Sequence, residues 1–170
     1  MPLSSMMVRI KREYKDVVND KAADIEIEPG EKLGHFIATI SGPRDTPYEG
    51  GRFKVDLQLA DDFPFKPTKI KFITSIYHPN ISSQTGAICM DILKDGWSPI
   101  MTIKASLLSL IILLSSPVPE DPQDAQVASH YLRDYDDYAR TAAHWTAVHA
   151  IPERPKSPVT LESLLSPKSP

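Results

Sequence analysis

The residues with the clearest chemical potential lie in a segment, 74–102, that has no regular hydrophobic period. It contains the only cysteine of the chain, Cys89, and the run His78-Pro79-Asn80, which ends nine residues earlier. A cysteine thiolate is both a good nucleophile and a good leaving group, so Cys89 is a candidate for covalent catalysis. Singly, each residue also has an ordinary explanation, because a lone cysteine is most often a small buried apolar residue. A long irregular stretch in a compact domain is usually functional, which favours chemistry here.

Composition excludes several classes of protein. The chain has 170 residues, 19 Lys plus Arg against 22 Asp plus Glu, and a formal net charge of −3. A single cysteine forms no internal disulfide and no multi-thiolate zinc site, and we expect no metal or cofactor. The slight acidity argues against nucleic-acid binding, and no apolar run is long enough to cross a membrane. The start of the chain does not resemble a secretory signal, so we expect a cytoplasmic or nuclear protein, or one present in both.

The elements that must position these residues are predicted from periodicity. Apolar residues spaced by three and four predict a first helix over about 7–17, which Ser4 or Ser5 is placed to cap. Four segments of alternating polarity follow at 24–28, 35–40, 53–59 and 69–74. Their connections show no helical pattern, which predicts an antiparallel meander with one wet face.

Three helices are expected after the irregular segment. The apolar run 105–114 has the length of a buried central helix. Asp121-Pro122-Gln123-Asp124 predicts a helix to about Arg133, with Asp121 as its cap and Pro122 at its first position. A last helix begins near Asp136 or Asp137. Its one face is formed by Tyr138, Ala142, Trp145 and His149. Residues 151–170 contain five prolines and read as a flexible tail, whose Ser-Pro pairs are either kinase targets or plain linker.

Several motifs occur together in an order typical of one family. They are Tyr77-His78-Pro79-Asn80-Ile81, Gly86-Ala87-Ile88-Cys89-Met90-Asp91 and Trp97-Ser98-Pro99, with Gly42-Pro43, Thr46–Gly51, Phe63–Pro67, Pro119–Pro122 and Trp145 in register. On these residues the sequence resembles the ubiquitin-conjugating enzyme family over about residues 5–150. Ser82–Cys89 and Asp121–Ala125 look most like the subgroup that builds ubiquitin chains and usually carries a C-terminal ubiquitin-associated domain. The tail is too short and too rich in proline to resemble that domain.

The resemblance implies an α+β fold (the UBC fold) over residues 1–150, with an N-terminal helix, a four-stranded antiparallel sheet, a central buried helix and two C-terminal helices. It implies that Cys89 accepts ubiquitin as a thioester and passes it to a lysine amine. Asn80 is assigned to the oxyanion of that step, and the alternative is that it braces the loop over Cys89. His78 and Pro79 are assigned to supporting the turn. Asp121 is assigned to orienting the incoming lysine, and the alternative is the helix cap named above.

Partner surfaces also follow from the resemblance. The basic first helix, with Arg9, Lys11 and Arg12, matches the surface that meets the ubiquitin-activating enzyme, and the alternative is a solvated face. Two loops match the surface for ligases of the RING or HECT type, and their residues are Phe65, Trp97, Ser98 and Pro99. Simple packing is the alternative for Phe65. The expected partners are therefore ubiquitin, the activating enzyme, ligases and protein substrates.

Two departures from the family pattern are Val118, where many members have asparagine, and Thr68, where a second proline is frequent. Two other functions remain open at this point. One is conjugation of another ubiquitin-like modifier. The other is a non-catalytic ubiquitin-binding scaffold, which the presence of Cys89, Asn80 and Asp121 disfavours.

Overall fold

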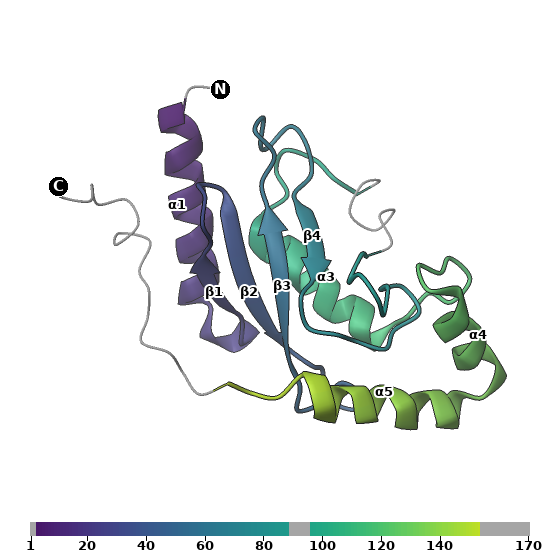
Figure 1. Cartoon of the computed structure of the whole chain (residues 1–170). Coiled ribbons are helices and arrows are strands. Elements are labelled where there is room, and N and C mark those ends of the chain that lie inside the picture. Colours follow the sequence, from purple (N-terminus) through teal and green to yellow (C-terminus); the bar gives the residue numbers. More distant parts are fainter. Residues whose placement is uncertain (1–2, 89–95, 154–170) are drawn as a thin grey trace.

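The structure is a computed structural model that describes residues 3–88 and 96–153. Its elements are α1 (Leu3–Asn19), a short 3-10 helix η1 (Lys21–Ala23), β1 (Glu26–Pro29), β2 (His35–Ser41), β3 (Arg52–Gln58), β4 (Lys69–Phe72), α3 (Ile103–Ser115), α4 (Ala125–Arg133) and α5 (Tyr135–His149). The predicted α+β class and order of elements are confirmed, from the first helix through the sheet to the three later helices (Figure 1).

The four strands form one antiparallel sheet in the order β1-β2-β3-β4, which confirms the predicted meander. Side chains alternate across the pleat, so one face carries the apolar residues. On β2 and β3 these are Phe36, Ala38, Ile40, Phe53, Val55 and Leu57, all at most 1% exposed. Helix α3 crosses behind this face in Figure 1, and its Leu107, Leu110 and Leu114 are buried in the same core.

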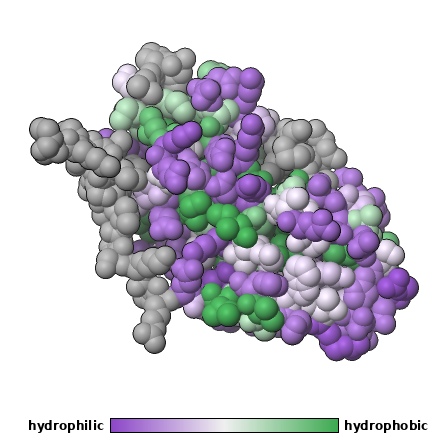
Figure 2. Space-filling model, viewed as in Figure 1, coloured by the Kyte–Doolittle hydropathy of each residue, from purple (hydrophilic) through white to green (hydrophobic). Residues whose placement is uncertain are grey.

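The other face of the sheet is turned to solvent. Figure 2, seen from this side, shows mainly hydrophilic residues with separate hydrophobic clusters. Asp56 departs from the predicted wet face, because only 9% of it is exposed. Its carboxylate lies 2.5 Å from His35 Nε2 and accepts a hydrogen bond from Gln58 Nε2, so neighbouring side chains on the sheet cover it.

Helix α1 packs beside the sheet, with Ile10 and Val17 in the core as its periodicity predicts. The predicted cap is wrong: the helix begins at Leu3, so Ser4 and Ser5 lie inside its first turn. The periodicity also did not mark Glu13, which is only 2% exposed.

Glu13 joins α1 to the start of α3. Its Oε2 accepts a hydrogen bond of 2.7 Å from the backbone N–H of Ile103, the first residue of α3, and its Oε1 accepts one of 2.9 Å from Arg9 Nε. The first N–H groups of a helix have no partner within the helix, and a carboxylate there also opposes the positive end of the helix dipole. Glu13 therefore shares the capping of α3 with Thr102, whose side chain accepts from Ala105 N–H.

The cap predicted for the next helix is also wrong. Asp121 and Pro122 precede the helix, and α4 begins at Ala125 with Asp124 as its N-cap. Both Asp121 and Asp124 are cap-type residues, and Asp124 is the one whose carboxylate reaches the N–H of Val127, at 3.2 Å.

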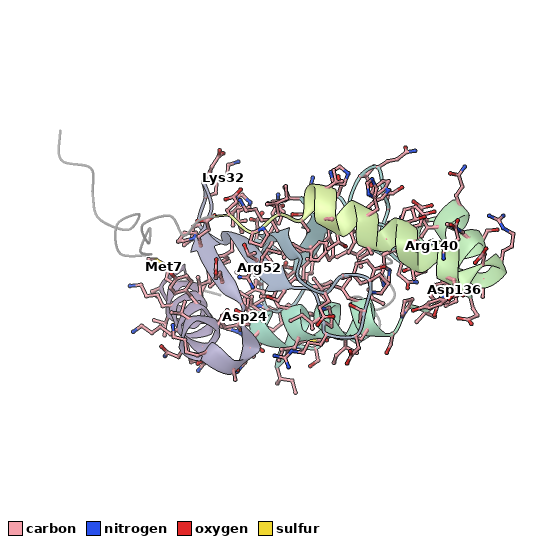
Figure 3. All side chains as sticks on the ribbon, turned by 90° about the horizontal axis from the view of Figure 1, so that it is seen from below. Met7, Asp24, Lys32, Arg52, Asp136 and Arg140 are labelled. Carbon is pink, nitrogen blue, oxygen red and sulfur yellow. The ribbon has the colours of Figure 1, made fainter. Side chains whose placement is uncertain are left out.

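Helix α5 lies at one end of the sheet, and Asp136 and Arg140 on it are far from Met7 on α1 (Figure 3). Its buried face contains Tyr138 and Ala142 as predicted, with Thr146 in place of the exposed His149. The approach to the sheet is close, because a Cβ added to Gly51 would lie 2.6 Å from Thr146 Cγ2. After α5, the carbonyl of Ala150 accepts from the N–H of Arg52 at 3.0 Å. Among the described residues, no helix combines the length and apolar character needed to cross a membrane.

The irregular segment is attached to α3 through His78, which is fully buried. Its Nε2 lies 3.0 Å from the carbonyl oxygen of Leu113, and its Nδ1 lies 3.0 Å from the N–H of Asn80. A carbonyl only accepts and an N–H only donates, so the proton sits on Nε2 and the ring is neutral. Burial lowers the pKa of His78 from 6.5 to about 4, and the bond to Leu113 opposes that shift only in part.

Removing the Glu13 carboxylate should destabilise the fold. In Glu13→Ala the N–H of Ile103 loses its buried acceptor, and a buried polar group left unpaired costs about 1–3 kcal/mol. Urea denaturation should show a loss of that size in the free energy of unfolding. Asp16→Ala, at an exposed acid on the same helix, is the control and should change it by less than about 0.5 kcal/mol. Equal effects of the two variants would contradict the capping role.

The buried neutral His78 should make stability depend on pH. Its pKa is lower in the folded chain than in the unfolded one, so below about pH 6.5 the unfolded chain takes up a proton that the folded chain does not. Stability is therefore full above that pH and declines toward pH 4, with about 2 kcal/mol lost between about pH 7 and pH 5. Urea denaturation across this range measures it. The slope should persist in His144→Gln, at an exposed histidine, and shrink in His78→Gln.

Candidate functional site

The segment before Cys89 is held in a short hairpin, and Cys89 itself lies outside the described residues. Ile81 pairs with Ile88 in an antiparallel bridge, and the N–H of Ser82 donates to the carbonyl of Ala87 at 2.8 Å. The turn needs Gly86, whose φ is +74° and whose missing Cβ would lie 2.0 Å from the carbonyl oxygen of Phe72. Ile88, the residue before Cys89, is thereby paired with Ile81, the residue after Asn80.

Asn80 is fully buried, and its side-chain amide makes three hydrogen bonds to the loop 117–124. Its Nδ2 donates to the carbonyl oxygens of Val118, at 2.8 Å, and Asp121, at 3.0 Å. Its Oδ1 accepts from the N–H of Val118 at 2.8 Å. Both amide hydrogens are thus in use, and the amide binds the loop as a brace does. Position 118 takes part through its backbone, so valine there keeps these contacts.

His78 and Pro79, the two residues before Asn80, fix the turn through different hydrogen bonds. The ring of His78 accepts from the N–H of Asn80, as described above. The carbonyl of Pro79 accepts from the N–H groups of Gln123 at 2.9 Å and Asp124 at 3.0 Å. The His-Pro-Asn turn and the loop 117–124 are therefore joined along both backbone and side chain.

Asp121 and Asp124 lie at different depths. Asp121 is exposed on the loop, and its backbone carbonyl accepts from Asn80. Asp124 is half-buried, and its Oδ2 accepts from both the N–H and the hydroxyl of Ser83, at 3.1 and 2.7 Å. Burial by itself raises the pKa of Asp124, but the hydrogen bonds from Ser83 and from the N–H of Val127 outweigh it, so the pKa lies below its usual value.

Aromatic residues to which the sequence assigned no role at the site hold the turn through Tyr77. The hydroxyl of Tyr48 donates to the carbonyl of Tyr77 at 2.7 Å and lies 2.5 Å from the hydroxyl of Tyr138. The hydroxyl of Tyr77 lies 2.9 Å from His130 Nδ1, and His130 Nε2 donates to Asp137 at 2.8 Å. The sequence placed Tyr77 and Tyr48 in motifs and Tyr138 on a helix face, but it did not indicate that they meet. Tyr48 comes from the segment between β2 and β3, and His130 and Tyr138 come from α4 and α5, so only the fold brings them together.

The two loops expected to meet ligases lie together. The indole N–H of Trp97 donates to the carbonyl of Pro64 at 2.9 Å, and its ring packs on Phe63 with centroids 6.1 Å apart. Phe65 is 64% exposed, so packing does not account for it. Pro99 is also exposed and Ser98 is half-buried. The exposed Ile100 continues this apolar surface.

The basic residues of α1 differ in their surroundings. Lys11 and Arg12 are exposed. Arg9 is half-buried, pairs with Glu13 and lies over the ring of Phe63, 5.0 Å from its centroid. Arg9 thus links α1 to the loop that carries Phe65.

The described residues contain no group of three or more His, Cys, Asp or Glu side chains placed to hold a metal ion.

Comparison with known proteins identifies the family. A family model described as "Ubiquitin-conjugating enzyme" matches residues 9–146. Ubiquitin-conjugating enzyme E2 1 of Schizosaccharomyces pombe is 52% identical over 143 residues, which are 84% of this chain and 66% of that protein. Ubiquitin-conjugating enzyme E2 K of Homo sapiens is 46% identical over 146 residues, 84% of this chain and 73% of that protein.

A solved structure agrees. The E2 domain of a Toxoplasma gondii ubiquitin-conjugating enzyme superposes with a TM-score of 0.80 at 43% identity, covering 85% of this chain and 99% of that one. The fold, the braced His-Pro-Asn turn and these relatives agree with one another. The chain therefore belongs to the ubiquitin-conjugating enzyme family.

Proposed function

We propose that this chain accepts ubiquitin from the activating enzyme as a thioester on Cys89 and transfers it to a lysine of a substrate or of ubiquitin, usually with a ligase. The family match over residues 9–146 is the observation that carries this proposal. The hairpin that leads into Cys89 and the His-Pro-Asn turn, which Asn80 joins to the loop 117–124, also support the proposal. We propose residues 1–150 as the catalytic domain, since α5 ends at His149.

The proposed chemistry has two steps. In the first, the Cys89 thiolate attacks the thioester of the activating enzyme, a new thioester forms on Cys89, and the cysteine of that enzyme leaves as a thiolate. In the second, a lysine amine attacks the thioester carbonyl and forms an oxyanion. That intermediate collapses to an amide, the Cys89 thiolate leaves and the nitrogen loses a proton.

We assign Asn80 to bracing the loop 117–124. Both Nδ2 hydrogens bond to carbonyl oxygens, so donation to an oxyanion would require one of these bonds to break. The hydrogen bonds of Asn80 favour bracing over the oxyanion role. His78 and Pro79 would support the same turn.

We assign Asp121 to orienting the incoming lysine. The rival role for Asp121, as cap of the following helix, belongs to Asp124. Asp121 is exposed, and its loop is bound on one side by Asn80. A carboxylate on a fixed loop can hold an amine in line with the thioester and favour its loss of a proton.

The proposed partner surfaces combine exposed and half-buried residues. Phe65, Trp97, Ser98 and Pro99 would meet ligases of the RING or HECT type. Lys11 and Arg12 would meet the activating enzyme through charge. Arg9 would act by linking the two surfaces, because its guanidinium is already paired with Glu13. The likeness of Ser82–Cys89 and Asp121–Ala125 to the chain-building subgroup suggests that the chain also builds ubiquitin chains. The lone cysteine suggests that it acts in the cytoplasm or the nucleus.

Loss of the thiol should abolish the adduct with ubiquitin. Incubation with activating enzyme, ATP and ubiquitin should give a band on a non-reducing gel that a thiol reagent removes. Cys89→Ala should give no band, and Cys89→Ser should give an oxyester that the thiol reagent does not remove. A thiol-sensitive adduct in Cys89→Ala would overturn the proposal, and charging with a different ubiquitin-like modifier alone would reassign the substrate.

Removal of the Asn80 amide should slow transfer and loosen the fold together. Asn80→Ala removes three hydrogen bonds between the buried amide and the backbone of the loop 117–124, and a cost of about 1–3 kcal/mol in stability is expected for their loss. We expect charging to proceed, discharge to free lysine to slow, and urea denaturation to show the loss. A loss of discharge of about 100-fold or more with unchanged stability would instead assign Asn80 to the oxyanion.

A further inference from the structure

Asp124 joins three parts of the site region. Its carboxylate caps α4 through the N–H of Val127, and its own N–H donates to the carbonyl of Pro79 at 3.0 Å. Its second carboxylate oxygen accepts two hydrogen bonds from Ser83, in the turn of the hairpin that leads to Cys89. A single residue therefore connects three parts of the site region: its carboxylate joins the hairpin to α4, and its backbone N–H holds the His-Pro-Asn turn.

A helix cap alone does not require these contacts. Asp134, the cap of α5, shows what a cap needs, since its Oδ1 accepts from the N–H of Asp137 at 3.0 Å. Both residues begin a helix with the same kind of bond. Only Asp124 uses its second oxygen to hold a distant turn, 41 residues away in the sequence.

We propose that Asp124 and Ser83 form a latch that positions the loop 117–124 against the hairpin of Cys89 for transfer to lysine. The latch is a pair of positioning residues, and it rests on the function proposed above. The loop carries Asp121 three residues before Asp124, and Asn80 binds its other end at Val118. The two ends are thus fixed by different groups, Asn80 at the start and the latch at the finish.

A fixed loop matters because attack on the thioester depends on alignment. A shift of about 1 Å in a positioning element costs up to about 100-fold in rate. The hairpin leads into Cys89, and the loop 117–124 carries Asp121. Movement of the loop relative to the hairpin would therefore misalign the lysine with the thioester. Charging involves a different acyl donor and does not use Asp121, so it should not depend on the latch.

The latch is suited to neutral pH. Burial raises the pKa of the Asp124 carboxyl, but the hydrogen bonds from Ser83 and from the first N–H groups of α4 outweigh it and hold the pKa below its usual value. The carboxylate that accepts from both groups of Ser83 is therefore ionised. These are charge-assisted bonds, which are about twice as strong as neutral ones.

Four variants test the latch while keeping the caps. Asp124→Ser keeps a good cap with one oxygen but provides no second acceptor for Ser83. Ser83→Ala removes the hydroxyl, and Ser83→Thr keeps it. Asp134→Ser makes the same change at the cap of α5 and is the matched control. Charging by the activating enzyme and single-turnover discharge to free lysine and to water are measured for each, below the unfolding temperature of every variant.

We expect Asp124→Ser to slow discharge to lysine by about 3- to 10-fold at saturating lysine, with unchanged charging and little change in hydrolysis. Ser83→Ala should act in the same direction, and the double variant should be no slower than Asp124→Ser, because both remove one interaction. Ser83→Thr and Asp134→Ser should behave as the parent chain.

Discharge at the parent rate in Asp124→Ser would overturn the latch, and so would equal slowing in Asp134→Ser or a parallel fall in charging and discharge. Failure of the parent chain itself to charge would overturn the proposed function, and the latch with it.

Discussion

The site depends on the need to satisfy a buried amide. Asn80 has no contact with water, so its side chain must find all its hydrogen-bond partners within the protein. It finds them on the loop 117–124, with two carbonyls for its N–H groups and one N–H for its oxygen. This set of bonds fixes a loop that is far from Asn80 in the sequence. It also determines which way the amide faces, because exchange of its oxygen and nitrogen would place like groups together.

The remaining fold supports that turn. The sheet and α3 enclose the core, and the ring of His78 donates a hydrogen bond to the carbonyl of Leu113 in α3. Tyr48 and His130 hold Tyr77 from the other side. The turn thus has polar contacts to the central helix, to the loop after it and to the C-terminal helices, and the side chains of His78 and Asn80 that make the first two are fully buried.

Two acidic residues accept hydrogen bonds from the first N–H groups of a helix and also bind a second element. Glu13 accepts from the first N–H of α3, and Asp124 from the N–H of Val127 in α4. In each case the second carboxylate oxygen reaches another element, Arg9 for Glu13 and Ser83 for Asp124. A carboxylate has room for several donors, so one residue can begin a helix and fasten a neighbouring segment.

Periods of two and about 3.6 residues follow from local backbone geometry, so the sequence pattern predicts the order of elements, the antiparallel sheet and the core face of β2 and β3. It also singled out Cys89 and His-Pro-Asn as a motif. It did not distinguish Asp124 from Asp121 as the cap, nor Glu13 and Arg9 from the solvated charges around them. The second contact of Asp124 depends on Ser83, the role of Glu13 on Ile103 and that of Arg9 on Phe63, and these partners are distant in the chain. Burial and long-range hydrogen-bond partners are properties of the packed molecule, so the roles of these charged residues follow from tertiary packing and not from the sequence pattern.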